Sequence, residues 1–523
     1  MSGSVTFEQI PAAWNVPGAY AEVTTVNSGT NLTAMPLRAL IVGVLAGGTG
    51  QAGVVYPNVS ASSAQTLAGA GSLAGRAVKA FVTDAPFTQL DLVLVSPLAG
   101  SAAQVWTVTP SVAGSGDQVA ATSDDTAASA SGATPVVVSG ASASGQVALV
   151  VNGVRVTATV SSGMTAAELG AALSAAFTSN IMSRTGVACA LNAATGALTL
   201  TALEKGGWTA DIDVRQSLLA TDTVPGVSLA VGVTTPGAGW PDMTPALSAV
   251  SHTWYTDIVT CLNDAANLAT FSVELTRRFN AMEKLDALGY AGFRGSYAQT
   301  LSLAGTLNNP HLTVLPANAP RWEPAVAAAS YAAVVSAALN TDPSRQLRGL
   351  SLTALSGLGP DDADRFDMDM RNVLLGDGMS TFLVGSDGTV TIERAVSTQT
   401  TDANGNATTA WRDIMVHATL SRVRYEWNYF ILTTYPRAKL ADDGDVLATI
   451  AGAGVVTPKI LKNAWAGQSA LYENAGWLQN TAALAKQAVF VIDPTDRNRV
   501  NCSVPVQVIG ALIVVATSIQ MQV

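Results

Sequence analysis

The sequence has little charge, few cysteines and no long hydrophobic run. Asp, Glu, Lys and Arg together make up 12% of its 523 residues, about half the share in an average globular protein. The three cysteines are scattered, so they give no disulfide framework and suit a reducing cytoplasm. The net charge of −10 argues against a nucleic-acid partner. So sparsely charged a surface indicates either a membrane protein or a subunit buried against its neighbours.

Segment length argues against membrane insertion. The most apolar run, residues 506–519, contains Gly510, Thr517 and Ser518 and falls short of the roughly 20 residues that a spanning helix needs. No basic residue precedes Arg38, and the first residues form no hydrophobic signal region. The composition therefore favours a subunit of a large assembly, with no membrane insertion.

Residues that carry hydrolytic or cofactor chemistry are also scarce. The three histidines, His252, His311 and His417, stand in no catalytic motif, and no GxSxG sequence accompanies them. Gly378-Met379-Ser380 comes nearest and lacks the context of a nucleophile. We expect no catalytic residue and no cofactor, and an α/β hydrolase is kept as the alternative from another functional class.

A glycine-rich segment and two acidic clusters have structural interpretations. Residues 48–53 match GxGxxG, but Val54-Val55-Tyr56-Pro57 follows where the dinucleotide fingerprint needs a helix. The aspartates at 361–369 lack the glycine and glutamate of a calcium-binding loop, so we interpret them as the charged first turn of a helix. We interpret the aspartates at 442–445 as a turn and helix cap. No metal site is expected.

Strand-like and helix-like segments alternate between residues 237 and 375. This alternation predicts a parallel sheet with right-handed crossovers. Two earlier apolar runs, Arg38–Leu45 and Leu90–Val95, are typical of buried strands. The expected later strands are 253–260, 290–294 and 312–315, and the expected helices are 264–282, 297–304 and 324–339.

Residues 111–236 are expected to form an inserted β-rich domain on the outer surface. The stretch 111–145 is rich in Ser, Ala, Gly and Thr and forms its lead-in. Asn152-Gly153 between two apolar runs predicts a tight hairpin. Thr165 and Glu168 form a capping box that opens a helix.

The region after residue 376 predicts an α+β domain. Two strands, 381–385 and 389–400, flank the turn Ser386-Asp387-Gly388. Apolar residues then recur at spacings of three and four from Val416 to Ile431, which predicts a helix of about five turns. Helices at 457–467 and 469–486, a strand at 488–493 and a final strand or strand pair at 506–523 complete the region.

Several segments resemble the contractile phage tail sheath proteins, specifically the Mu-like branch. They are NVPGAYAEV (15–23), GAGSLAGRAVKAF (69–81), DAANLATFSVELTRRFNAM (264–282), TIERAVST (391–398), TLSRVRYEW (419–427) and PRAKLADDGD (436–445). The resemblance implies a subunit that polymerises around an inner tail tube and contracts to drive the tube through the target envelope. A sheath of a secretion system or of a phage-derived bacteriocin is the alternative within this class.

The expected fold is α/β and α+β multidomain. The parts are an N-terminal arm (1–27), an N-terminal α/β segment packing with the middle domain (28–110), the inserted β-rich domain (111–236), an α/β domain of the kind loosely called subtilisin-like (237–375), the C-terminal sheath domain (376–504) and a C-terminal arm strand (505–523). The implied partners are further copies of the chain, the inner tube protein, and the baseplate and tail terminator proteins. The implied location is the virion tail, after assembly in the host bacterial cytoplasm.

Two sets of residues are candidates for contacts in the assembly. The terminal segments are expected to add as strands to sheets of neighbouring subunits, through Tyr20, Glu22, Thr24 and Val26 at one end and Leu512, Val514 and Ile519 at the other. The competing interpretation is that both strands complete a sheet in their own subunit. Candidate tube-facing residues are Arg422, Arg424, Lys459 and Lys462, for which a solvated face or ion pairs within the chain is the alternative.

Overall fold

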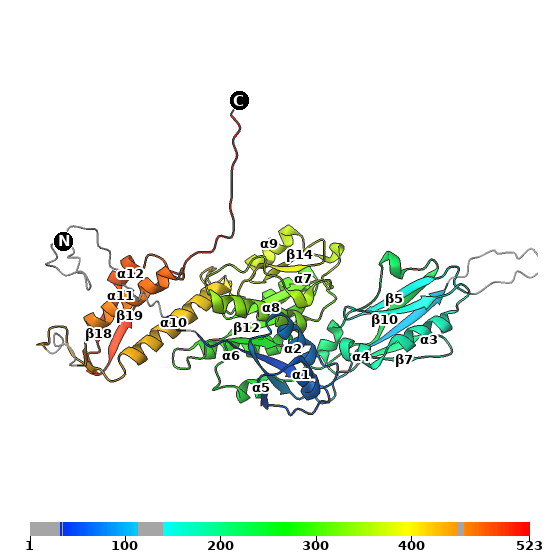
Figure 1. The fold of residues 1–523 in the computed structure, drawn as a ribbon, viewed down its shortest axis with the longest axis horizontal. Helices are drawn as coiled ribbons and strands as arrows, with labels where there is room; N and C mark the ends of the chain where they lie inside the picture. The colour runs from blue at the N-terminus through cyan, green and yellow to red at the C-terminus, as the bar shows by residue number, and fades with distance from the viewer. Residues whose placement is uncertain (1–31, 34, 113–139, 447–453, 523) are drawn as a thin grey trace, which may run out of the picture. The chain divides into compact units, whose positions relative to one another are not determined.

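The computed structural model describes residues 32–33, 35–112, 140–446 and 454–522. The chain divides into two compact units. The larger unit contains the described residues of 35–425, 476–479 and 506–522, and the smaller contains residues 32–33 and the described residues of 426–475 and 480–505. Helix α10 (Ile414–Thr434) begins in the larger unit and ends in the smaller (Figure 1). The division therefore falls within α10, and not at residue 376.

A six-stranded sheet lies at the centre of the larger unit. Its order is β13-β12-β11-β1-β3-β2, and only the edge strand β2 runs antiparallel to its neighbour. The two early strands thus join the later three in one parallel sheet, whereas the sequence predicted this sheet only for residues 237–375 and two separate buried strands before it. The strands are β1 (Arg38–Val44), β2 (Val55–Tyr56), β3 (Gln89–Val95), β11 (Asp257–Thr260), β12 (Leu288–Arg294) and β13 (Leu312–Ala317).

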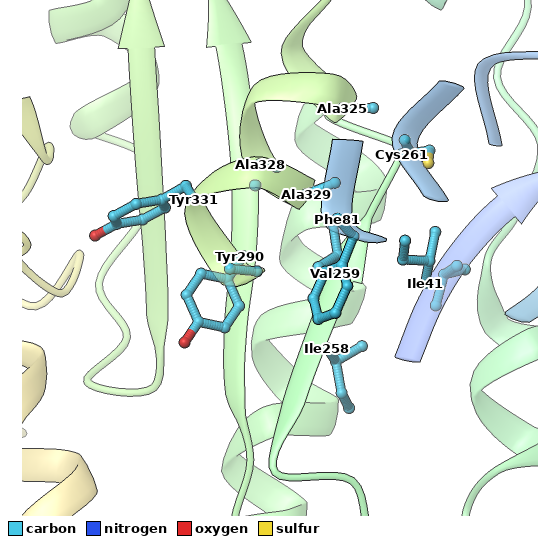
Figure 2. Packing of buried hydrophobic residues seen from close by; sticks show 14 of the residues in the cluster. Ile41, Phe81, Ile258, Val259, Cys261, Tyr290, Ala325, Ala328, Ala329 and Tyr331 are labelled. Carbon is cyan, nitrogen blue, oxygen red and sulfur yellow. The ribbon is translucent and has the colours of Figure 1, made fainter. Parts of the chain in front are cut away.

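Helices cover both faces of this sheet. On one face, α2 (Leu73–Asp84) and α8 (Pro324–Thr341) pack against each other and against β1, β11 and β12, with Phe81 and Ala328 in the core (Figure 2). A side chain at Gly292 would overlap the α8 backbone, so glycine permits this close approach. On the other face, α6 (Ala265–Phe279) packs on β12, and α5 (Thr244–Ala249) packs on β3.

One described helix, α8, is long and apolar enough to span a membrane by length and composition. Of its apolar window, 67% is buried inside the protein. Its alanines meet α2 and the sheet, so its hydropathy reflects a place in the core.

The larger unit without its insertion is called the body. It contains a break between two helices near its N-terminal end. Helix α1 ends and helix α2 begins around Gly69 and Gly71, which have φ of 124° and 74°, so residues 67–81 do not form one continuous helix. The predicted hairpin at Ser386-Asp387-Gly388 is present. The other elements are α1 (Ala61–Ala68), α7 (Tyr297–Ala304), η3 (Thr353–Leu355), η4 (Asp362–Asp364), α9 (Met368–Gly376), β14 (Thr381–Val384) and β15 (Val390–Arg394).

The insertion has its own hydrophobic core, built on a four-stranded sheet (β10-β4-β8-β7) and a three-stranded sheet (β6-β5-β9). It begins earlier than predicted, because β4 precedes the low-complexity stretch and pairs with β10. That stretch is therefore internal to the insertion, and its residues 113–139 lie outside the described residues. Ala102 and Ala238 exchange backbone hydrogen bonds of 2.9 and 3.1 Å where the insertion leaves the body.

The predicted Asn152-Gly153 hairpin and the helix capped by Thr165 are both present in the insertion. Its elements are β4 (Val105–Val112), β5 (Gly145–Val151), β6 (Val154–Val160), α3 (Ala166–Ala176), α4 (Ser179–Thr185), β7 (Val187–Leu191), β8 (Leu198–Ala202), η1 (Gly207–Asp211), β9 (Val214–Gln216), η2 (Ala220–Asp222) and β10 (Val227–Thr235).

The smaller unit is built around aromatic side chains. Trp427 on α10 meets Trp465 on α11 edge to face, with ring centroids 5.1 Å apart, and Tyr472 lies beyond Trp465. The predicted strand at 488–493 is present and forms a hairpin with a strand that was not predicted, β19. The elements are β16 (Lys439–Leu440), β17 (Val455–Val456), α11 (Pro458–Asn474), α12 (Thr481–Gln487), β18 (Val489–Ile492) and β19 (Val500–Ser503).

Candidate functional site

The C-terminal segment of the larger unit is apolar and exposed. Leu512 and Val514 are each 77% exposed, and Ile519 is 92% exposed. The four N-terminal candidates, Tyr20, Glu22, Thr24 and Val26, lie outside the described residues. Exposed apolar side chains on an extended segment are costly in water and invite a partner.

The same segment forms no strand in its own chain, so the expected final strand at 506–523 is wrong for the described residues. Backbone bonds hold residues 507–509 to Trp477 and Gln479, and a single bridge joins Val508 to Leu478. None of the described residues 510–522 is assigned to a strand. The described part of the chain offers these residues no strand to pair with. The predicted strand therefore does not form within this part of the chain.

The hairpin β18–β19 in the smaller unit has open edges. It is two-stranded, and within the described residues each strand pairs only with the other. Phe490 is buried on the side that packs against α11, while Val489 and Val491 are half exposed on the other. A two-stranded sheet with apolar exposed residues is marginal alone and can accept a further strand at either edge.

Arg424 makes contacts within the larger unit. Its Nε donates to Asp286 Oδ2 at 2.9 Å and its Nη1 to the Phe279 carbonyl at 3.0 Å. The guanidinium carbon also lies 4.2 Å from the Phe279 ring centroid. These contacts support the alternative of an ion pair within the chain for this residue.

The other three basic candidates lie in different settings. Arg422 lies over the Trp477 ring at 5.2 Å, also in the larger unit. Lys459 is exposed at the start of α11, and Lys462 Nζ donates to the Lys486 carbonyl at 2.9 Å in the smaller unit. The structure thus brings Lys459 and Lys462 together on one helix, and nothing in it identifies what they face.

The histidines have structural environments. His311 and His417 are buried, with their Nδ1 atoms 2.8 Å apart, so one neutral ring donates to the other. Burial lowers the pKa of His311 to about 4. Burial, with His311 and Arg424 nearby, holds the pKa of His417 well below its ordinary value. Such rings are poor proton acceptors near neutral pH, and His252 is exposed at the surface.

Ser380 is a buried hydrogen-bond centre. Its Oγ accepts from the Val396 amide at 2.9 Å and lies 2.9 Å from Thr313 Oγ1 and 3.2 Å from the Tyr331 hydroxyl. The bond to Val396 also explains why β15 ends at Arg394 instead of continuing to residue 400. Ser380 therefore has a structural role: its hydrogen bonds hold the start of β14 against the six-stranded sheet.

The glycine-rich segment after β1 has its amides occupied. Gly48, Thr49 and Gly50 donate their backbone N–H groups to the carbonyls of residues 66–68 at the end of α1. A side chain at Gly48 would overlap the Leu67 carbonyl. The glycines therefore serve close packing, and these amides do not point toward a phosphate.

The acidic clusters have the predicted structural roles. Asp367 caps α9 by accepting from the Met370 amide at 2.8 Å. Asp443 accepts from the Lys459 amide at 2.8 Å at the start of α11. Within the described residues, no group of three or more His, Cys, Asp or Glu side chains is arranged to hold a metal ion.

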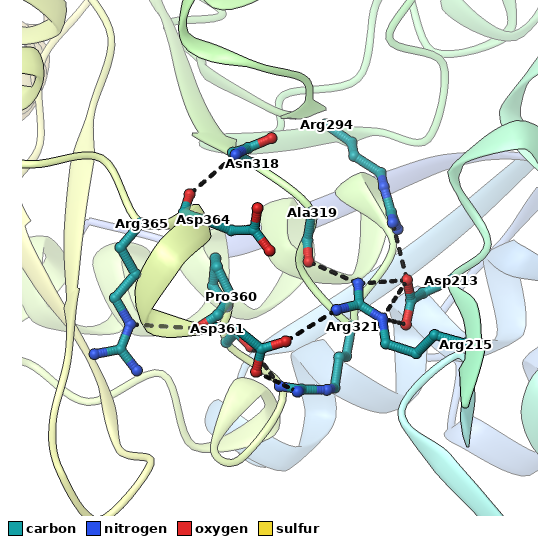
Figure 3. A network of polar contacts seen from close by, with 11 residues as sticks. Asp213, Arg215, Arg294, Asn318, Ala319, Arg321, Pro360, Asp361, Asp364 and Arg365 are labelled. Atoms are coloured by element: carbon teal, nitrogen blue, oxygen red, sulfur yellow. Dashed lines mark hydrogen bonds and ion pairs between the residues drawn. The ribbon is translucent and has the colours of Figure 1, made fainter. Parts of the chain in front are cut away.

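Polar residues join the insertion to the body, as Figure 3 shows. Arg215 of β9 donates to the Ala319 carbonyl at 2.9 Å and pairs with Asp361 at 3.2 Å. Asp213 accepts from Arg294 at the end of β12 at 3.0 Å. The half-exposed Asp361 pair contributes little free energy, but the buried Asp213 would be costly to leave unpaired.

A second, buried group of charges lies at the same junction. Arg76 of α2 makes two 2.6 Å bonds to Glu323, which also accepts from Asn152 of the insertion at 2.8 Å. Glu204 of the insertion accepts from the Leu73 amide at 3.1 Å. Burial raises the pKa of Glu204 to about 7, although the Arg76 charge opposes this rise. These paired contacts fix the orientation of the insertion on the body.

Comparison with known proteins gives one relative over nearly the whole chain. The "Mu-like prophage FluMu tail sheath protein" of Haemophilus influenzae is 27% identical over 477 residues, which cover 88% of each chain. No protein-family model matches the sequence.

Three solved structures show weaker likeness. A sheath tail protein from Desulfitobacterium hafniense has a TM-score of 0.43 at 12% identity, covering 94% of this chain and all of its own. A sheath tail protein from Listeria innocua has a TM-score of 0.45 at 10% identity, covering 91% and 93%. A chain of the anti-feeding prophage baseplate has a TM-score of 0.37 at 9% identity, covering 55% and 75%.

Proposed function

We infer that this chain is a phage tail sheath protein, and we propose that it works as one subunit of a contractile tail sheath. Its similarity to the Haemophilus protein extends over 88% of both chains. The observation that carries the proposal is the exposed apolar segment 510–522, which has no strand partner in the described part of its own chain. A subunit that presents such a segment is suited to a polymer.

The proposed connection between subunits is strand exchange. Leu512, Val514 and Ile519 of one copy would add to an open edge of β18–β19 in a neighbouring copy, and the N-terminal segment with Tyr20, Glu22, Thr24 and Val26 would do the same. Main-chain hydrogen bonds supply most of the affinity in this mode. They depend little on side chains, so they can persist while the globular parts rotate and repack during contraction.

The work of such a sheath is mechanical. The polymer assembles around an inner tail tube in a strained extended state and contracts to a packing of lower free energy, which drives the tube into the target cell. Energy stored at assembly makes hydrolysis unnecessary, in agreement with the buried, structural settings of Ser380, His311 and His417. A secretion-system or bacteriocin sheath would use the same mechanism, but the prophage relative favours a virion tail.

The proposed partners are the inner tube protein and the baseplate and tail terminator proteins, with assembly in the host cytoplasm. Lys459 and Lys462 remain proposed tube-facing residues, because they lie on one helix of the smaller unit. Arg422 is retained with them, whereas the Asp286 pair leaves Arg424 less able to contact a tube.

Truncation after Ala511 tests the proposal. We expect the shortened chain to keep its far-ultraviolet circular dichroism and melting temperature but to stay monomeric in sedimentation, whereas the full chain forms tubes or rings at micromolar concentration. The matched control is the double substitution Leu218→Ser and Leu219→Ser, which removes exposed apolar side chains from the insertion. Normal tubes from the truncated chain would reject strand exchange at this end.

A further inference from the structure

Phe87 is an exposed aromatic side chain at a fixed position. It lies between α2 and β3, in a turn closed by a 3.3 Å bond from the Thr88 amide to the Ala85 carbonyl. Its side chain is 98% exposed, whereas Tyr429, another exposed aromatic residue, is 44% exposed. Pro86 precedes it and has a fixed φ, which restricts the backbone of the turn. Exposed aromatic side chains are frequent anchors of protein interfaces.

A cavity of about 200 Å³ lies between the end of β13 and strand β14. Its walls include Phe366, Phe382, Pro316 and Pro360, and two guanidinium groups, of Arg365 and Arg371, also line it. Apolar walls with cations beside them suit an aromatic ring, whose face attracts a positive charge.

The two guanidinium groups are held in place. Arg371 Nε donates to Glu393 at 2.8 Å, and Arg365 Nε donates to the Pro360 carbonyl at 3.2 Å. Figure 3 shows the contact of Arg365 with Pro360. The cavity is therefore already shaped for a ring before any partner arrives, which lowers the entropy cost of binding.

The exposed ring and the cavity lie at opposite ends of one sheet. Phe87 precedes β3, which starts at Gln89, while Pro316 belongs to the last residues of β13. Both strands run parallel within the six-stranded sheet, so the ring lies at the amino end and the cavity at the carboxyl end. Phe87 thus cannot reach the cavity of its own chain. A contact between two copies would leave one ring and one cavity free, and such head-to-tail contacts continue into open polymers.

We propose that Phe87 of one copy inserts into the cavity between Phe366 and Phe382 of a second copy, as a contact between the bodies of adjacent subunits. This inference rests on the proposed function only in that copies of the chain assemble. It adds a contact separate from strand exchange, which involves the terminal segments and β18–β19.

Photocrosslinking tests the contact directly. Phe87 is replaced by p-benzoylphenylalanine in the full chain, which keeps an aromatic ring at this position, and the assembled protein is irradiated. We expect crosslinks to a second copy within residues 360–371 or 381–384, identified by mass spectrometry of mixed isotope-labelled chains. The same residue at Met282, which is 87% exposed, is the matched control and should not reach the cavity. Crosslinks from position 87 that map only to other segments overturn the proposal.

Substitution on each side of the contact separates this proposal from the proposed function. Phe87→Ser removes the ring without touching a core, and Leu383→Trp fills the cavity that Leu383 lines. Each should raise the concentration needed for polymerisation at least tenfold while the melting temperature stays near that of the wild type, and Met282→Ser should not. If Phe87→Ser polymerises like the wild type, this inference fails and the sheath function stands. If the wild-type chain never polymerises, the proposed function and this contact both fail.

Discussion

His311 and His417 can keep their 2.8 Å hydrogen bond only while one of the two Nδ1 atoms is unprotonated and accepts from the other. Phe279 stacks on His311 with ring centroids 4.1 Å apart, and the Arg424 guanidinium lies against the same phenyl ring. Positive charge on the imidazoles would therefore be both poorly solvated and close to another cation. The histidine pair therefore stabilises the packing of the start of α10 against the segment before β13 near neutral pH, and this packing is sensitive to acid.

The His417→Asn variant tests this sensitivity. Both histidines have a lower pKa when folded than when unfolded, so the unfolded chain binds protons that the folded chain does not, and their contribution to stability is lost as pH falls below about 6.5. Asparagine can hydrogen-bond to His311 and does not titrate. From pH 7 to pH 5 the wild type should lose about 2 kcal/mol more free energy of unfolding than the variant. Urea denaturation of dilute, monomeric protein at each pH measures this, and parallel losses would contradict it.

Ser380→Ala should destabilise the protein without removing any activity. The variant leaves the buried Val396 amide without its acceptor and removes the bonds to Thr313 and Tyr331. Leaving a buried donor unsatisfied costs about 1–3 kcal/mol. Ser302→Ala on the exposed side of α7 is the control, with no change in melting temperature expected. Esterase activity that is present in the wild type and lost in Ser380→Ala would contradict a purely structural role.

Turns, hairpins and helix caps were predicted correctly, because a few neighbouring residues determine their geometry. The turn at Ser386-Asp387-Gly388, the Asn152-Gly153 hairpin and the capping box at Thr165 all appear where the sequence indicates them. The long helix α10 was predicted from its apolar period. Other strands were missed. β4 depends on pairing with β10, which is distant in the chain, and β19 pairs with the adjacent strand β18 across a polar turn.

The candidate residues for contacts in the assembly were also predictable only where a local sequence signal exists. The apolar character of residues 511–515 is visible in the sequence, and the structure leaves the described part of this segment exposed. The Arg424 pair with Asp286 joins residues far apart in the chain and has no sequence signal. The cavity beside β14 is likewise lined by residues from separate segments between Pro316 and Val384, and no local sequence pattern predicts that they meet.

Removal of the insertion should leave a folded body. Its core is separate from that of the body except for Trp208, which packs into the core of the body, and Ala102 and Ala238 already pair as neighbouring strands do. We therefore expect a chain in which an Asn-Gly turn joins these two residues to fold, with a melting temperature lower by about 5–10 °C because Trp208 and the contacts of Glu323 and Asp361 to the insertion are lost. Circular dichroism and electron microscopy should show a folded protein that still forms tubes. An unfolded deletion variant would mean that the insertion completes the body.

For the whole molecule, sparse charge predicts how assembly responds to salt. Only 12% of the residues are charged, and the contacts proposed between subunits are apolar or between main chains. Salt therefore has few ion pairs between subunits to weaken by screening. We expect the concentration at which tubes form to change by less than about threefold between 0.05 and 0.5 M sodium chloride. Sedimentation across this range measures it. Tubes that dissolve at high salt would indicate that ion pairs hold the polymer, and a monomer at every salt concentration would contradict assembly itself.

The paired backbones of Ala102 and Ala238 also affect what a relative of this chain can carry. Because the polypeptide leaves and re-enters the body at one place, the chain connection itself does not restrict the length of what lies between. A foreign domain whose termini are adjacent could replace residues 103–237 and be displayed once per subunit along the polymer. The same position would let a lineage of such proteins gain, lose or exchange this domain without altering the strand order of the six-stranded sheet.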